Sequence, residues 1–319
     1  MGTLQLVGRR LLATIPVLLG VTLLTFFALD LLPGTAASQL LGAEATAEQI
    51  ARLEARLGLE RPAWERYRRW LGGVLAGDLG RSLASGRPVG AMVAERLPAT
   101  LELVGIAFAL SLGVAVPTAL AAARRPEGPT DRLCMAASML ALSVPPYVLA
   151  LLLVLAFAVG LGVLPAVGFT PAGEGLAAHV RSVVLPAAAI ALPLAAFYSR
   201  FLRGDLLEQL QGQDYVLTAV SKGLGPWRVL LRHALPNSLL GLLTVVGLNL
   251  GALISGTVIV EQIFGIPGVG QLLLQAINLR DAVVVQAIVL VLAATTVLAN
   301  LAVDLLYAVL DPRIRYGGA

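Results

Sequence analysis

Uncharged stretches long enough to cross a lipid bilayer recur along the whole chain. A helix rises about 1.5 Å per residue, so about 20 apolar residues span about 30 Å of hydrocarbon. Six such stretches are present: Leu11–Leu29, Leu103–Ala123, the run after Arg132 that stays uncharged to Gly173, and those between Arg181 and Arg200, His233 and Glu261, and Asp281 and Asp304. No ten-residue alternation of the kind found in membrane β-strands competes with them. The pattern predicts an all-α, polytopic membrane protein with six transmembrane helices.

Composition supports this prediction and excludes several other classes of protein. The chain is 58% hydrophobic and only 13% charged, whereas an ordinary soluble domain has about 25% charged residues. Its single cysteine, Cys134, rules out an intramolecular disulfide. His179 and His233 lie on either side of a predicted membrane crossing and cannot form a metal site alone. The net charge of +4 is spread over many loops without a basic, aromatic-rich helix, so no nucleic-acid partner is expected.

The distribution of Lys and Arg predicts the orientation. The first stretch is longer than the core of a cleavable signal peptide, so it is interpreted as a retained helix with a cytoplasmic N-terminus. The long segment after it is left out of the count, since long loops cross the membrane regardless of charge. The remaining outer loops carry only Arg181 and Arg280, and the inner ones carry Arg9, Arg10, Arg124, Arg125, Arg132, Arg200, Arg203, Lys222, Arg228, Arg232, Arg313 and Arg315. The chain is expected in the bacterial inner membrane, with both termini in the cytoplasm.

Four parts follow from this topology. Residues 1–31 form the cytoplasmic N-terminus and the first transmembrane helix, 32–96 an extracytoplasmic segment, 97–308 the core with helices two to six, and 309–319 a cytoplasmic tail. Within the outer segment, helical spacing predicts a charged helix over Ala47–Leu57. We interpret this segment as a lid on the outer membrane face rather than as a ligand site.

The cytoplasmic loop 204–236, between the fourth and fifth spans, has internal organisation. Asp214 to Gly223 reads as a short amphipathic helix ended by glycine. A second short helix begins at Pro226, and Pro236 is expected to close the loop before the fifth span. A helix, a glycine turn and a second helix can form a rigid protrusion, which predicts contact with a partner protein.

At this loop the sequence resembles the permease subunits of binding-protein-dependent ABC importers, in the dipeptide, oligopeptide and nickel group. Thr218 and Ala219 match the small pair of the family signature, Gly223 its glycine and Leu235-Pro236 its closing pair, while Leu217 stands where the signature has Glu. Further resemblances lie at Gly77–Ser82, Arg96–Glu102, Val260–Gln271 and Asp304–Arg313.

The resemblance implies the type I permease fold of ABC importers and a set of partners. These are a second related permease, two ATP-binding subunits, an extracytoplasmic solute-binding protein and the lipid bilayer. The chain would form half of the translocation pathway, and its loop 214–236 would dock on the ATPase. It would bind no cofactor itself, because ATP and Mg would be held by the partner. The docking residues so implied are Asp214, Thr218, Ala219, Lys222, Gly223, Trp227, Arg228, Leu235 and Pro236.

Residue chemistry in the loop is compatible with docking. Small side chains at Ala219 and Gly223 permit close backbone approach, and Lys222 and Arg228 offer charge to an acidic rim. Trp227 is of the type that anchors interfaces. The alternative is that Trp227 is an aromatic side chain of the membrane interface and that the basic residues only set the topology.

The chain is not expected to be an enzyme. A phosphate-binding Walker loop needs Gly-Lys followed by Ser or Thr, but the sole lysine, Lys222, follows Ser221 and precedes Gly223. Neither a Gly-x-Ser-x-Gly elbow nor a His-Glu-x-x-His pair is present. Hydrolysis of ATP must therefore come from a partner subunit.

The sequence leaves several alternatives open for the transported solute and for its route through the membrane. Peptides are the first hypothesis, and a nickel chelate or glutathione in the same importer class is the alternative. A secondary transporter is disfavoured, because the centres of the spans lack ionisable residues. Asn249 and Asn300 lie inside spans and are candidates for the solute path. Gly247 and Gly251, four residues apart, predict one stripe of close helix packing.

Overall fold

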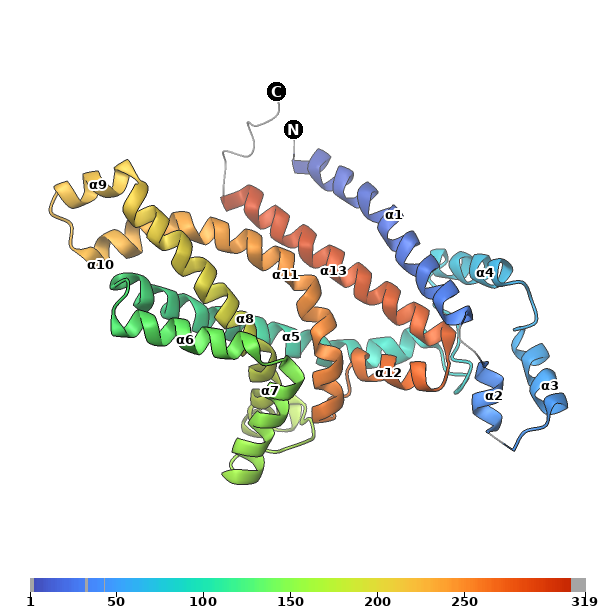
Figure 1. The fold of residues 1–319 in the computed structure, drawn as a ribbon. Coiled ribbons are helices and arrows are strands. Elements are labelled where there is room, and N and C mark those ends of the chain that lie inside the picture. Colours follow the sequence, from blue (N-terminus) through green and yellow to red (C-terminus); the bar gives the residue numbers. More distant parts are fainter. Residues whose placement is uncertain (1–2, 32–33, 43, 311–319) are drawn as a thin grey trace. The chain divides into compact units, whose positions relative to one another are not determined.

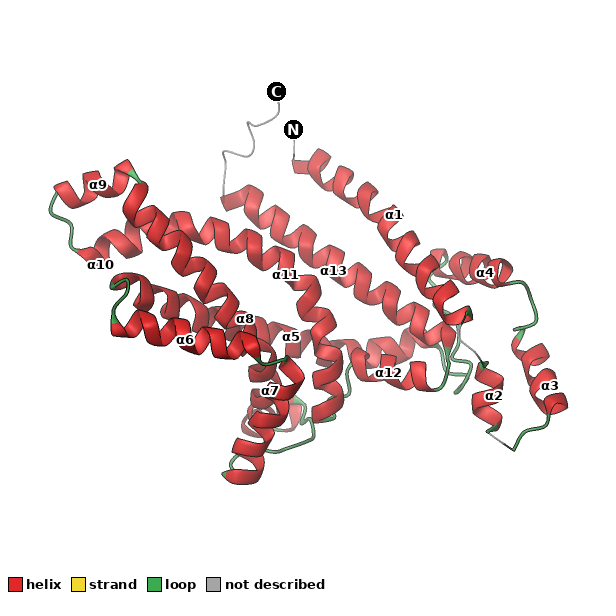
Figure 2. Cartoon of the chain, in the orientation of Figure 1, coloured by secondary structure: helices red, strands yellow, loops and turns green. Residues whose placement is uncertain are grey.

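The computed structural model describes residues 3–31, 34–42 and 44–310 (Figure 1). Within these ranges the chain consists of helices, turns and loops, with a single isolated β-bridge between Arg81 and Pro88 (Figure 2). The long helices are α1 (Thr3–Asp30), α5 (Val89–Arg124), α8 (Leu176–Gly212), α11 (Leu235–Phe264) and α13 (Ala282–Leu310). The all-α prediction is confirmed.

Five described stretches are long and apolar enough to cross a membrane as single helices, and bent helix pairs raise the number to at most seven. They are Leu12–Asp30, Val89–Arg124, Leu176–Gly212, Pro226–Gly251 and Ala282–Val303. The six predicted spans fall in this range. The span predicted after Arg132 is present as a bent pair of helical segments, Pro129–Ser143 and Pro146–Gly160, at 104° to each other, and not as one straight helix.

The break has a local cause. α6 (Pro129–Ser143) stops where Pro145 and Pro146 follow, and α7 (Pro146–Leu153) begins with Pro146 at a first-turn position. Proline removes a backbone donor and disfavours helix in the residue before it, so two in succession end one helix and start another. α7 continues as a π-helical segment, η1 (Val154–Gly160).

After η1 the chain leaves this stretch through a non-helical loop that is tied to α8. The Arg181 guanidinium donates to the carbonyl of Val163 at 2.7 Å, and the Ser182 hydroxyl accepts from the Thr170 amide at 3.2 Å. The buried ring of His179 lies 2.8 Å from the Thr170 carbonyl and 3.0 Å from the Glu102 carboxylate. One turn of α8 thus fixes the whole exit loop.

The chain forms two compact units, and each is described by itself. The first contains Leu101–Ile266 and residues from Ala299 onward, and the second contains the residues up to Thr100 together with Pro267–Leu298.

The first unit is built around α8, which packs against α6, α7 and α11. Its core combines fully buried alanines on α5 with larger side chains of α8, such as Tyr198 and Leu202. Small residues let helix backbones approach closely where lipid supplies no hydrophobic driving force. The predicted close stripe is confirmed at Gly247, where an added Cβ would lie 2.7 Å from Val303 Cγ1, whereas an added Cβ at Gly256 would meet nothing within 4 Å.

The end of α11 buries an acidic side chain, that of Glu261. Gly265 has the left-handed backbone (φ 65°) typical of a helix end, and the Ile266 amide donates to the Glu261 carbonyl at 2.9 Å. The Glu261 side chain is fully buried (0% exposed). It is therefore not part of an exposed surface that a docked receptor could reach.

The second unit combines α1 with the short helices α2 (Ala36–Leu41), α3 (Ala47–Leu57), α4 (Ala63–Leu75) and α12 (Val269–Asn278). The predicted helix over Ala47–Leu57 is confirmed at both ends, with Thr46 and Gln49 forming a reciprocal capping box. Single polar side chains join segments that are far apart in sequence. Ser82 donates to the Asp281 carboxylate at 2.6 Å, and the Thr100 hydroxyl accepts from the Val269 amide at 2.8 Å.

Candidate functional site

The protrusion predicted between the fourth and fifth spans is present as a helical hairpin. It consists of α9 (Asp214–Ser221), a turn, and α10 (Pro226–Val229), which continues through a π-helical turn, η3 (Leu230–Ala234), into α11. We call residues 214–234 the hairpin. The predicted start at residue 204 needs correction, because α8 remains helical to Gly212 and the loop proper begins at Gln213.

Pro236 was expected to close the loop before the fifth span, and it stands at the start of α11 without interrupting the helical path. Pro236 lies in the first turn of α11, directly after the π-helical turn. A proline inside a regular α-helix leaves the carbonyl four residues earlier without its donor and clashes with it. A π-helical turn shifts the hydrogen-bonding register and relieves this clash. The helix therefore passes through Pro236 instead of ending there.

A small apolar core holds the hairpin together. Val216 and Ala219 of α9 are buried against Val229 of α10, and Leu210 and Leu224 cover them. Ala219 is only 4% exposed. Its expected role in close approach to a partner is corrected accordingly, because its small side chain serves the packing of α9 against α10.

The turn of the hairpin requires glycine. Gly223 has φ +80°, a left-handed conformation, and its amide donates to the Val220 carbonyl at 2.9 Å. The next amide, of Leu224, donates to the Ala219 carbonyl at 3.2 Å. These two bonds are the Schellman arrangement that ends helices at a glycine. The predicted glycine end of this helix is confirmed.

Most of the predicted docking residues lie on the surface. Leu235 is half-buried, and the exposed ones are Asp214, Thr218, Lys222, Gly223, Trp227, Arg228 and Pro236. The structure adds apolar side chains that sequence reasoning missed, since Leu217 and Val220 of α9 are 63% and 56% exposed. Their alternation with the buried Val216 and Ala219 was the available signal, because one face of an amphipathic helix must point away from its neighbour.

Trp227 borders a groove beside the hairpin. The groove has a volume of about 350 Å³ and is lined by the end of α5, by α8 and by both hairpin helices. The Arg124 guanidinium lies over the Trp227 ring, 5.0 Å from its centroid, a cation–π contact that orients the indole. Trp227 remains partly exposed, as an anchor for a partner or for the membrane interface would be.

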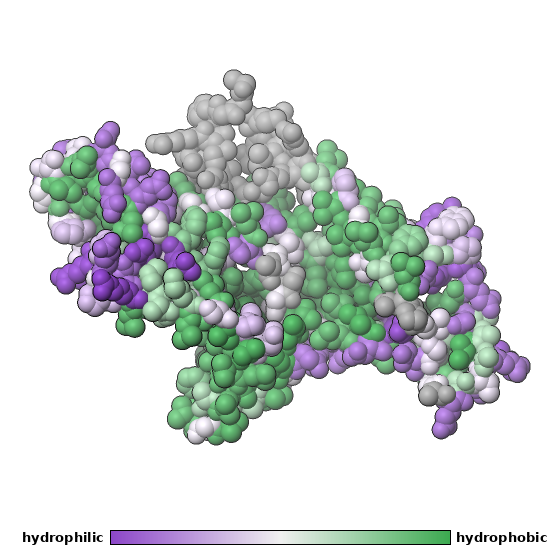
Figure 3. All heavy atoms as spheres, in the orientation of Figure 1, coloured by the Kyte–Doolittle hydropathy of each residue, from purple (hydrophilic) through white to green (hydrophobic). Residues whose placement is uncertain are grey.

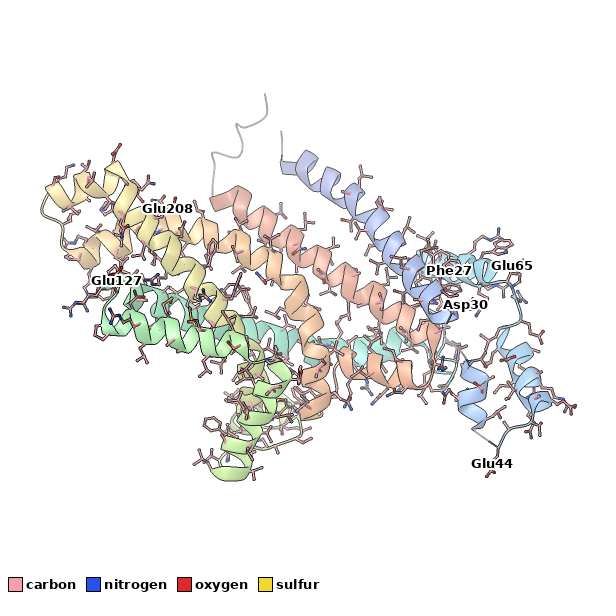
Figure 4. The ribbon with its side chains drawn as sticks, viewed as in Figure 1. Phe27, Asp30, Glu44, Glu65, Glu127 and Glu208 are labelled. Carbon is pink, nitrogen blue, oxygen red and sulfur yellow. The ribbon has the colours of Figure 1, made fainter. Side chains whose placement is uncertain are left out.

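An ion pair joins α6 to α8 within the first unit. The Arg203 guanidinium of α8 donates two bonds of 2.5 Å to the buried carboxylate of Asp131 on α6, which also accepts from the Glu127 amide at 2.8 Å. Two parallel bonds fix both the distance and the orientation of a guanidinium and a carboxylate. Figure 4 shows Glu127 at the turn before α6 and Glu208 on the last turns of α8.

Within the first unit, polar and apolar residues cover different parts of the surface, as is typical of a protein embedded in a membrane. Hydrophilic residues gather over α9, α10 and the α5–α6 turn, whereas hydrophobic residues cover the segment of α7 and η1 (Figure 3). In that segment Leu151, Leu155 and Val159 are more than half exposed. Such exposure suits contact with hydrocarbon or with another apolar protein surface.

The two candidates for the solute path have different surroundings. The Asn249 amide donates to the Val245 carbonyl of its own helix at 2.8 Å. Asn300 has a buried side-chain oxygen without a hydrogen bond in the described part of the chain. Both lie in the first unit, and their role in solute transfer stays a prediction.

Comparison with known proteins decides the class of the chain. The family model described as "Binding-protein-dependent transport system inner membrane component" matches residues 115–316, and the model for the N-terminal part of such membrane components matches residues 3–104. The chain belongs to this family. The permease is thus the multi-pass inner-membrane component of an ABC importer, which works with an ATPase and a solute-binding protein and does not itself hydrolyse ATP.

Relatives match the permease over nearly its whole length. A provisionally named peptide transport system permease of Brucella abortus is 40% identical over 98% of this chain and 99% of that protein. The dipeptide transport system permease DppB of Alkalihalophilus pseudofirmus is 37% identical over 97% and 98%. The glutathione transport system permease GsiC of Salmonella paratyphi A is 38% identical over 98% and 99%.

A solved structure shares the fold. A chain of the inward-facing MetNI methionine ABC transporter superposes with a TM-score of 0.57 at 17% identity, over 69% of the permease and 96% of that chain. The predicted type I permease fold, the predicted family and the predicted absence of an enzymatic role in this chain are confirmed.

Proposed function

We propose that the permease forms half of the translocation pathway of an ATP-driven peptide importer and receives the motion of its ATPase through the hairpin. A second related permease would complete the pathway, two ATP-binding subunits would hold ATP and Mg, and an extracytoplasmic solute-binding protein would deliver the solute. The permease itself would bind no cofactor. Similarity to peptide, dipeptide and glutathione permeases over the whole chain supports the solute class.

The geometry of the hairpin carries the proposal. It has its own apolar core and a glycine cap, so it keeps its shape without the membrane around it. Its outer face presents Leu217, Val220 and Trp227 beside the cations Lys222 and Arg228. Apolar side chains surrounded by charge are typical of a docking surface. Because α10 runs into α11 through η3, a force on the hairpin reaches the membrane-spanning helix directly.

The hairpin turn provides the experiment. Replacing Gly223 by Val places a β-branched residue at φ +80°, which costs on the order of 1 to 2 kcal/mol and distorts the turn. We expect ATPase assembly to fall and ATP-dependent dipeptide uptake in proteoliposomes to be lost, while the amount of inserted permease stays unchanged. Gly225→Val is the matched control, since Gly225 has φ −66° and open space around it. Normal uptake by Gly223→Val would show that the hairpin is only a connector.

The exposed face can be tested without touching the turn. Leu217→Asp adds a charge at the centre of the apolar surface and leaves the hairpin core intact. We expect it to abolish co-purification of the ATPase, whereas Gln211→Asp, at an exposed position before the hairpin, should have no effect. Equal ATPase binding by both variants would exclude this face as the docking surface.

Orientation is part of the proposal, with both termini and the hairpin in the cytoplasm. In a Cys134→Ala background, Ser85→Cys and Gly212→Cys place thiols at exposed positions. An impermeant maleimide added to right-side-out vesicles should label only the first and, in inverted vesicles, only the second. Labelling of both from one side would refute the topology.

The solute can be narrowed within the same assay. Uptake of a radiolabelled dipeptide should be competed by unlabelled dipeptide more strongly than by glutathione or a nickel chelate. The similarity to GsiC keeps glutathione, itself a peptide, as the second candidate. Stronger competition by glutathione would identify glutathione as the preferred solute.

A further inference from the structure

The second unit contains a cavity of about 480 Å³ that the importer mechanism does not use. It is lined by the end of α1, by α2 and α4, and by the segment that joins α12 to α13. Cavities of this volume hold small molecules in many proteins. Apolar side chains such as Phe26 and Leu29 share the lining with Asp30, Arg66, Arg280 and Gln286.

The charged groups of the lining are unequally satisfied. Arg66 forms an ion pair with Asp30 and lies over the Phe26 ring, 5.6 Å from its centroid. Asp30 stands at the end of α1, beside α4 (Figure 4). The Arg280 side chain has no hydrogen bond or ion pair within the described residues. Asp30 offsets Arg66, so the cavity keeps the positive charge of Arg280.

A buried amide faces the same space. Gln286 is only 3% exposed and lines the cavity, and its side chain bonds to no described residue. The Arg66 Nε is also buried without a hydrogen-bond partner in the described part of the chain. Buried polar groups are nearly always hydrogen-bonded, so these donors are available to an acceptor that enters the cavity.

The backbone at Arg280 is held in an unfavourable conformation. Its φ is +52°, a left-handed value that is uncommon for residues other than glycine. The neighbouring Asp281 holds it there, because the Asp281 amide donates to the Ala276 carbonyl at 2.8 Å and the Asp281 carboxylate accepts from Ser82 and Ala84. Strained residues held by their surroundings gather at binding sites.

The guanidinium of Arg280 lies beside Gly34. An added Cβ at Gly34 would lie 3.7 Å from Cζ and from Nε of Arg280, and Gly34 itself has φ +91°. A guanidinium with free donors, next to a buried amide, matches the planar geometry of a carboxylate. We propose that this cavity binds the free C-terminal carboxylate of a short peptide, with Arg280 as the ionic partner and Gln286 as a hydrogen-bond donor.

Short peptides are the expected occupant for two reasons. The cavity has room beyond the carboxylate, and the apolar lining suits small side chains. The choice of a peptide rests on the proposed function, whereas the carboxylate rests on the residues alone. An accessory site of this kind would hold released solute close to the permease.

Binding to the purified full-length permease in nanodiscs of zwitterionic lipid tests the inference, without ATPase or uptake. The probe is the dipeptide Ala-Ala, titrated by calorimetry beside its C-terminal amide and inorganic phosphate. We expect Ala-Ala to bind at least about tenfold more tightly than the amide or phosphate, since a charged hydrogen-bonded partner is lost or mismatched. Equal binding of the amide or of phosphate would overturn the carboxylate assignment, even if peptide uptake is normal.

The variant Arg280→Gly locates the binding. Glycine is at ease at φ +52°, so this change removes the guanidinium without adding backbone strain. We expect it to weaken Ala-Ala binding about tenfold or more with no fall in the thermal midpoint, and Arg280→Lys to weaken it less. Glu127→Gly, at a left-handed position in the other unit, and Arg56→Gln, outside the cavity, are the controls and should bind normally. Unchanged binding by Arg280→Gly would refute the site.

Discussion

Each unit of the permease buries an aspartate, and the two are satisfied in opposite ways. Asp131 of the first unit faces the guanidinium of Arg203, which donates two bonds to its carboxylate. Asp281 of the second unit pairs with no cation in the described part of the chain and accepts from a hydroxyl and from backbone amides. Both residues are about 2% exposed. The same residue type thus makes an ion pair in one unit and a hydrogen-bonded clamp in the other.

Weakening a buried ion pair and weakening a carboxylate held by neutral donors have different costs in stability. An ion pair inside a protein adds little over an apolar pair, but removing one partner strands the other charge in a poor solvent. A clamp built on neutral donors strands no charge when it is weakened, so only hydrogen bonds are lost. Conservative substitutions should therefore affect the two units unequally.

The largest effect is expected for Asp131→Asn. It leaves Arg203 without its counter-charge, and because that side chain is 21% exposed we expect a loss of unfolding free energy near the lower limit for such pairs, about 3 kcal/mol. Denaturant unfolding of the detergent-solubilised permease measures it. The double variant Asp131→Asn, Arg203→Met should recover most of the loss. A double variant as unstable as the single one would show that the charge of Arg203 is not the cause.

A smaller effect is expected for Asp281→Asn. The amide oxygen can still accept from Ser82, and no cation is left behind, so the loss should be about 1 kcal/mol. Asp281→Ala removes every acceptor and should cost more, about 2 kcal/mol. The same unfolding assay compares them. If Asp281→Asn were as damaging as Asp131→Asn, the contrast between an ion pair and a neutral clamp would fail.

The smallest effect is expected for Arg87→Gln in the second unit. Arg87 and Glu95 form an ion pair of 2.7 Å, but both side chains are more than half exposed. We expect a change of about 0.5 kcal/mol or less, because water screens exposed pairs. Raising the salt to about 1 M should reduce the remaining difference in stability between this variant and the parent, because salt screens exposed charges. A loss as large as that of Asp281→Asn would mean that solvent exposure does not determine how much these contacts contribute to the free energy of unfolding.

Features carried by periodic or uncharged runs were predictable from the sequence. Spans as long as Leu103–Ala123 need only hydropathy, and the helix over Ala47–Leu57 was delimited by its own caps. The turn at Gly223 was equally local, since glycine supplies the left-handed residue that ends a helix. The exposed docking residues came instead from the resemblance to the permease family, and the apolar Leu217 and Val220 beside them were missed.

What could not be predicted depends on which segments meet. α9 is apolar on more than one side, so eight residues alone do not tell whether Ala219 or Leu217 faces α10. The charges after Gly204 suggested a loop, although the same residues continue α8 to Gly212. The bond from Ser82 to Asp281 joins residues 199 positions apart, and no local pattern announces it.

The π-helical turn at Leu230–Ala234 has a mechanical consequence. It lets Pro226–Gly251 continue as one 26-residue helical stretch, which at 1.5 Å per residue is a lever about 39 Å long. A tilt of about 5° at the hairpin end would displace the other end by about 3 Å, roughly the diameter of a water molecule. Because the widened turn lies close to the driven end, any bending within it would act over nearly the whole lever, so the stroke depends on the stiffness of Leu230–Ala234.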